Sequence, residues 1–100
     1  MTGIELIAKE RKEQLEKHGR TIKADVDFNS VEDETYLGLY PLVAGAIGVL
    51  DKGFGRTPKH WNQVDVVEHM KSKEYKDRLV VAGALIAAEI DRLQYIENQK

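Results

Sequence analysis

Apolar residues near the N-terminus recur at helical spacing and predict a first helix over residues 3–18. Thr2 is a suitable N-cap, and Glu5 stands three residues later, which is the spacing of a capping box. Gly19 follows the pattern and is typical of a helix C-terminus. One narrow stripe of this helix should be buried: Ile4, Ile7, Ala8, Arg11 and Leu15.

Residues 20–29 show no sustained period and are predicted as a connector, with room for a short extended piece. Ile22, Val26 and Phe28 are expected to hold this connector against the core. Ser30 should then cap a second helix that reaches about Leu50, because three acids occupy its first turn.

Pro41 interrupts the second helical pattern and has no backbone N–H to donate. We expect either a kink or a break near Tyr40, and the pattern leaves both open. Small residues follow, and they indicate that another helix packs very close, either within the chain or from a second subunit: Ala44, Gly45, Ala46 and Gly48.

A loop is predicted over residues 51–57, and Thr57-Pro58 is typical of a helix start, with that helix ending near residue 71. The last helix should run over residues 73–97, capped by Ser72. Between Leu79 and Ala88 it is apolar on every side, so we expect it to be central and surrounded by protein. One long stripe follows it: Tyr75, Leu79, Ala82, Ile86, Ile90 and Leu93.

These elements predict an all-α fold, a small bundle of about four helices that forms a single domain over residues 1–100. A monomer of this size can hardly cover the apolar last helix, so we expect a homo-oligomer, most simply a dimer. The absence of cysteine excludes disulfides, thiolate metal sites and a cysteine nucleophile. No apolar run is long enough for a membrane span, and the N-terminus does not fit a signal peptide, so a cytoplasmic protein is expected.

Charge is unevenly placed along the chain, although the net charge is only −2. Residues 24–51 hold six acids and no base, whereas residues 52–78 hold seven bases and four acids. The two segments can face each other across the fold, or they can provide an ion-binding site. The small net charge gives no reason to expect binding to a nucleic-acid polymer.

The loop over residues 53–61 is the first candidate for a ligand site, because it combines glycines, cationic groups and the only Trp of the chain. It leads into a predicted helix N-terminus, which attracts anions. A phosphate with a stacked base would suit this set. The alternative is a solvated loop with Trp61 folded into the core.

Carboxylates provide the second candidate. Glu89 should be partly buried and paired, either with a cation such as Arg11 or Arg92 or with a metal or ligand. Asp25 and Asp27 stand near the acids at 32–34, and such oxygen ligands can bind Mg²⁺, although a solvated acidic turn explains them equally. No residues are arranged as a Ser–His–Asp triad, and we assign no catalytic residue.

Two segments resemble a group of small helical proteins that phages and prophages often encode. Residues 8–19, AKERKEQLEKHG, are similar to the opening helix of that group, which an acidic turn follows. Residues 79–93, LVVAGALIAAEIDRL, resemble its closing helix, with Val81 in place of a lysine. The wider layout is also similar to that of MazG-like all-α nucleoside triphosphate pyrophosphohydrolases, which implies Mg²⁺ held by carboxylates of two helices. The corresponding helix here, residues 36–50, has no acid, so catalysis would be lost or relocated.

Three hypotheses follow from the residues and the resemblance. The first is non-catalytic binding of a small phosphorylated ligand, such as a nucleotide, by an oligomer of phage type that needs no cofactor; its expected contacts are Arg11, Arg20, Arg56, Lys59, His60 and Trp61. The second is a MazG-like hydrolase that holds Mg²⁺ with Asp25, Asp27, Glu32 and Glu89. The third is a protein-interaction module that presents the acidic second helix to a partner protein.

Overall fold

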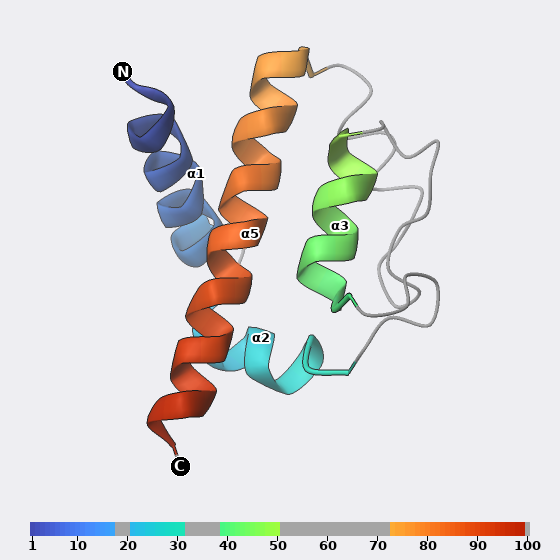
Figure 1. Cartoon of the computed structure of the whole chain (residues 1–100). Helices are drawn as coiled ribbons and strands as arrows, with labels where there is room; N and C mark the ends of the chain where they lie inside the picture. The colour runs from blue at the N-terminus through green and yellow to red at the C-terminus, as the bar shows by residue number, and fades with distance from the viewer. Residues whose placement is uncertain (18–20, 32–38, 51–72, 100) are drawn as a thin grey trace.

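The computed structural model describes residues 1–17, 21–31, 39–50 and 73–99. These residues form four α-helices and no strand: α1 (Gly3–Lys17), α2 (Ile22–Phe28), α3 (Pro41–Leu50) and α5 (Tyr75–Asn98). The long helix α5 lies between α1 and α3, and α2 lies beside its C-terminal half (Figure 1). Because the other three helices all pack against α5, the described residues confirm the all-α fold and the central last helix. The predicted loop at 51–57 and the helix after Pro58 lie outside the described residues. The last helix begins at Tyr75 with Glu74 as its N-cap, so the predicted start at residue 73 with Ser72 as the cap is wrong.

The start of α1 is the predicted capping box. The backbone N–H of Thr2 donates to Glu5 Oε1 over 3.0 Å, and the backbone N–H of Glu5 donates to Thr2 Oγ1 over 3.2 Å. Two backbone donors at the helix N-terminus are satisfied in this way. Donation to the carboxylate from the Thr2 backbone lowers the pKa of Glu5 from its usual value of 4.5.

The capping box should make α1 sensitive to acid. A carboxylate whose pKa is lowered in the folded state stabilises that state above its unfolded pKa, and the stabilisation is lost as the pH falls through the lower folded value. We expect Glu5→Gln to remove this contribution between pH 7 and pH 3, because glutamine caps without titrating. Urea unfolding of both chains across that range checks it, with Glu10→Gln, outside the first turn, as the control. Equal pH slopes for the parent and Glu5→Gln would contradict the role of Glu5.

The buried face of α1 differs from the predicted stripe. Ile4 is 82% exposed and Ala8 is also exposed, so their predicted burial is wrong, whereas Arg11 is buried together with Gln14. Ile7 explains how α1 approaches α5: a Cβ built on Gly83 would lie 2.7 Å from Ile7 Cδ1. Gly83 therefore lets the two helices come close at this point, and Ile4, one turn earlier, lies outside the contact.

Residues 20–29 were expected as a connector, but residues 22–28 form α2. Thr21 is its N-cap, and Thr21 Oγ1 accepts the backbone N–H of Ala24 over 3.1 Å. Ile22 and Val26 are partly buried, as expected, but Phe28 is 72% exposed, so its predicted place in the core is wrong. Thr is a residue type favoured at the N-cap, so Thr21 was the local signal of this helix in the sequence.

Pro41 marks a break in the predicted second helix and not a kink. Leu39 and Tyr40 are not helical, and α3 begins at Pro41, where the missing N–H has no helical partner to lose. The Tyr40 carbonyl accepts the backbone N–H groups of Val43 and Ala44. Ser30, the predicted cap of that helix, donates its hydroxyl to the Val26 carbonyl and so closes α2; the residues just after Val31 lie outside the described ones.

The apolar core lies between α3 and α5. The four small residues predicted to allow close packing are all buried in α3, and Ala46 among them lies in the apolar cluster shared with α5. The cluster at the centre of this interface is formed by Leu42, Ala46, Val49, Val81, Ala82, Leu85 and Ala88. Small side chains therefore bring α3 close to α5, and Leu42 and Leu85 fill the space between them.

The long stripe predicted for α5 is exposed except at Ala82. The structure exposes 42–64% of each of five side chains that were expected to be buried: Tyr75, Leu79, Ile86, Ile90 and Leu93. The helix α3 packs instead on the Ala- and Val-rich face of α5. A single chain therefore leaves part of this helix uncovered, and its coverage by a second subunit stays a prediction from the sequence.

Arg78 ties the start of α5 to the end of α3. Its Nη1 donates to the Leu50 carbonyl over 2.7 Å, and its guanidinium lies 5.6 Å from the centre of the Tyr75 ring. A cation at a helix C-terminus is favoured by the helix dipole. Within the described part of the chain, none of the helices combines the length and the hydropathy needed to cross a membrane.

Candidate functional site

The polar side chains that are buried in the described residues gather where α1, α2 and α5 meet. The buried polar cluster consists of Arg11, Gln14, Asp25, Asn29, Glu89 and Arg92. Four of these six carry formal charge, and Arg92 is only 2% exposed. Charged groups in such positions need partners, because removing an ion from water costs several kcal/mol.

Arg11 forms the part of the cluster that joins three helices. Its Nε donates to Asp91 Oδ2 of α5 over 3.3 Å, and its Nη2 lies 4.0 Å from Asp25 Oδ2 of α2. Asn29 Nδ2 in turn donates to Asp25 Oδ1 over 3.0 Å. One guanidinium of α1 therefore lies between carboxylates of two other helices and holds their positions relative to one another.

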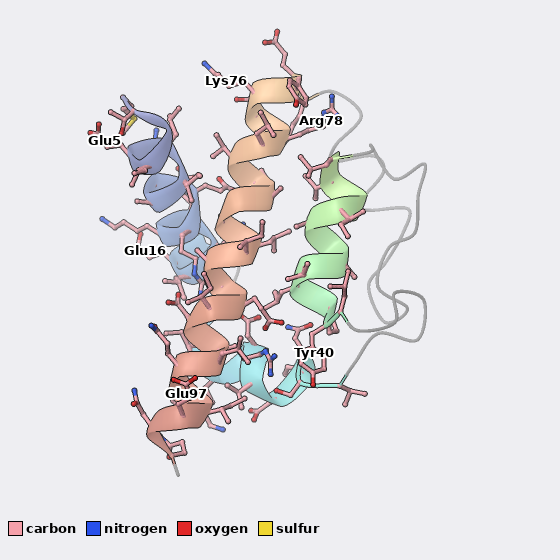
Figure 2. The ribbon with its side chains drawn as sticks, in the orientation of Figure 1. Glu5, Glu16, Tyr40, Lys76, Arg78 and Glu97 are labelled. Carbon is pink, nitrogen blue, oxygen red and sulfur yellow. The ribbon has the colours of Figure 1, made fainter. Side chains whose placement is uncertain are left out.

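Arg92 forms the second part of the cluster. Its Nε donates to Glu89 Oε1 in a short bond one turn back along α5, and its Nη1 donates to Ser30 Oγ over 3.0 Å. The guanidinium lies 4.7 Å from the centre of the Tyr40 ring, a cation–π contact just before α3. Tyr40 lies at the start of α3, close to α2, in Figure 2. Arg92 Nη2 is buried and has no hydrogen-bond acceptor among the described residues.

The electrostatic balance of this region is slightly negative. Two guanidiniums, of Arg11 and Arg92, face three carboxylates, of Asp25, Glu89 and the half-exposed Asp91. Each carboxylate has a guanidinium partner, which is the condition for keeping it charged inside a protein. The arrangement can therefore hold a rigid polar junction, and the buried Nη2 amino group of Arg92 is able to donate to a further acceptor.

Of the six predicted ligand contacts, the structure describes one. Arg11 is buried in the cluster, whereas Arg20, Arg56, Lys59, His60 and Trp61 lie outside the described residues. The contribution of these five residues to a ligand site stays a prediction from the sequence.

The predicted metal ligands are divided in space. Asp25 and Glu89 are both buried in the cluster, where Asn29 and Arg92 hold them. Asp27 is half-exposed and pairs with Lys23 over 3.2 Å, and Glu32 lies outside the described residues. Across the described ranges, no three acidic or histidine side chains come close enough together to hold a metal ion.

Sequence reasoning found part of this cluster. The burial and pairing of Glu89 were predicted, with Arg92 named as one of its two possible partners, and the structure selects Arg92. Gln14 and Tyr40 were not singled out. Gln14 follows Arg11 by three residues, so it shares the buried face of α1, and this spacing was the available signal.

No known protein family, curated protein or solved structure matches the chain. The resemblance to helical phage proteins and to MazG-like enzymes therefore stays a prediction from the residues that carry it.

Proposed function

We propose that this chain binds a small phosphorylated ligand, most simply a nucleotide, without converting it. The observation that supports this proposal is Arg92: a buried guanidinium that stacks on an aromatic ring and whose Nη2 amino group has no acceptor in the described residues. Arginine is the side chain best suited to bind phosphate oxygens, because its donors form a planar fork. A buried donor without an acceptor costs about 1–3 kcal/mol, which a ligand oxygen would recover.

Charge sets a condition on this proposal. Together with the neighbouring Asp91, the cluster has three carboxylates against two guanidiniums, so it does not attract an anion by itself. Additional cations are required, and the basic segment over residues 52–78 contains the predicted contacts Arg56 and Lys59. The proposal therefore makes binding depend on two groups of residues: Arg92 with its ring partner Tyr40, and the cations of the basic segment.

For the cellular location and the oligomeric state of the chain, we propose what the sequence predicts. The chain would act in the cytoplasm as a homo-oligomer of phage type and would sequester a nucleotide. Such a role needs affinity and no catalytic group, in keeping with the lack of an assignable catalytic triad in the sequence.

Thermal unfolding in the presence of mono-, di-, tri- and cyclic nucleotides, with Mg²⁺ or with a chelator, tests this function. A nucleotide at about 100 times its Kd should stabilise the chain by roughly 2.7 kcal/mol and raise Tm by about 10 °C. Calorimetric titration of the nucleotide that gives the shift then compares variants. Arg92→Lys keeps the charge but loses the fork, and Arg56→Ala/Lys59→Ala removes two cations of the basic segment; each should weaken binding at least tenfold. Lys12→Ala, at an exposed lysine of α1, is the matched control and should bind as the parent does.

The outcomes separate the hypotheses. A chelator-resistant shift that both variants reduce supports the proposal. No shift with any nucleotide overturns it and favours the protein-interaction module.

Mg²⁺-dependent hydrolysis is the second candidate, because the predicted metal ligands Asp25 and Glu89 lie in the same cluster. It requires pyrophosphate release from a nucleoside triphosphate that Mg²⁺ supports and that Asp25→Asn abolishes. The absence of release at high protein concentration would remove this candidate.

A further inference from the structure

An apolar stripe follows the exposed side of α5. This α5 stripe consists of Leu79, Ile86, Ile90 and Leu93, which are 42%, 45%, 52% and 43% exposed. Leu79, Ile86 and Leu93 recur every seven residues, so they lie on one face of the helix. The core residues of α5 lie on a different face, against α3, and α1 packs on α5 at Gly83, beside the stripe.

The stripe has the spacing and length of a helix-pairing surface. Leu79 and Leu93 are 14 residues apart, so the stripe is about 21 Å long. Heptad spacing of large aliphatic side chains is the pattern by which two helices bury each other's apolar surface. A continuous row of half-exposed leucine and isoleucine also differs from the single, scattered apolar side chains that need no explanation on a protein surface.

From this geometry we propose that two copies of the chain pair through the α5 stripe, with their α5 helices antiparallel. The charges at the two ends of α5 determine the direction. Lys76 and Glu97 are both exposed and lie near opposite ends of α5 (Figure 2). An antiparallel pair places Lys76 of one copy beside Glu97 of the other, twice, whereas a parallel pair places like charges together.

The apolar and charged positions also agree on the register. A twofold axis that pairs Lys76 with Glu97 passes α5 at position 86.5, half of 76 plus 97. The middle of the stripe, between Leu79 and Leu93, is position 86. One axis near Ile86 therefore aligns the apolar contacts and both ion pairs, which is the self-complementarity that an isologous dimer requires.

Cysteine cross-linking of the full chain tests both pairing and direction, because the chain has no cysteine of its own. Lys76 and Glu97 are 21 residues apart on one helix, about 32 Å, so a disulfide between them cannot form within a single copy. We expect the double variant Lys76→Cys/Glu97→Cys to form a disulfide-linked dimer on mild oxidation at low protein concentration. The two single variants, which are the matched controls, should remain unlinked.

Sedimentation measures the strength of the pairing. Ile86→Glu places a charge on the axis and should weaken the dimer about a hundredfold while the far-UV circular dichroism of the helices is retained. Lys76→Glu and Glu97→Lys should each weaken it about tenfold, and the two together should restore it, because the pairs re-form with reversed sign.

Three results would overturn the proposal. They are a parent chain that stays monomeric at millimolar concentration, cross-linking of either single variant, and failure of the double charge reversal to restore what the single changes lose. None of these results bears on nucleotide affinity, so the proposed function and this interface can fail independently.

Discussion

Arg92→Ala is expected to lower the free energy of unfolding by about 3–5 kcal/mol. The guanidinium is 2% exposed, and it forms the ion pair with the buried Glu89 carboxylate. Its removal leaves that carboxylate inside the protein without the charge that balances it, and it also removes the donor to Ser30 and the cation over Tyr40. Because a domain of this kind is stable by roughly 5–15 kcal/mol, the variant should unfold at a much lower urea concentration.

Equilibrium urea unfolding, followed by circular dichroism, checks this result. The control is Lys12→Ala, which breaks the exposed pair with Glu16 and should change the free energy by less than about 0.5 kcal/mol. A second variant, Glu89→Met/Arg92→Met, removes both charges and keeps most of the volume. It should recover most of the stability lost in Arg92→Ala, since a buried pair is far less costly to replace than to break. A loss below about 1 kcal/mol in Arg92→Ala would show that water reaches Glu89 and that the pair behaves as a surface one.

The starts of α1 and α3 were predicted from local residues alone. Thr2 and Glu5 form their capping box from residues within one turn, so no tertiary contact is needed to specify it. Pro41 likewise acts locally: it lacks an N–H, and the structure places it where none is needed. Tertiary packing had only to decide between a kink and a break.

The choice of buried face was not predictable from side-chain size. On α5 the larger residues Leu79, Ile86 and Ile90 are half-exposed, while Ala82, Ala84 and Ala88 are buried. Small residues on α3 and α5 allow the two axes to approach closely, and the core forms on that side. The helical period of α5 was predicted correctly from the sequence. Which face of α5 is buried depends on where α3 packs, and this is decided by the tertiary fold.

The sequence predicted the burial of one residue of the candidate site, but it did not predict how the residues of the site come together. A carboxylate at the end of an apolar helical run must be paired, which sufficed to predict the burial of Glu89. The junction of Arg11 with Asp25 depends on α2, and the sequence pattern gave a connector in its place. The helix α2 is what places Asp25 beside Arg11 and leads to Ser30 beside Arg92. The cluster could therefore not be predicted from the sequence pattern alone.

The core between α3 and α5 gives the second large effect. Leu42→Ala is expected to lower the free energy of unfolding by about 2–5 kcal/mol, through lost burial and the cavity that remains. Leu42 is fully buried, and its neighbours in the core are small, so they fill little of the space that its side chain leaves.

Leu50→Ala is the matched control for this variant, because it makes the same change on the same helix at a side chain that is 37% exposed. The loss there should be about half as large, since part of the Leu50 side chain is already in water. Urea unfolding of both variants gives the comparison. Equal losses would mean that the contact of α3 with α5 contributes no more to stability than the end of α3 does. A loss near 5 kcal/mol only in Leu42→Ala would mean that the small residues hold the two helices too rigidly to close the cavity.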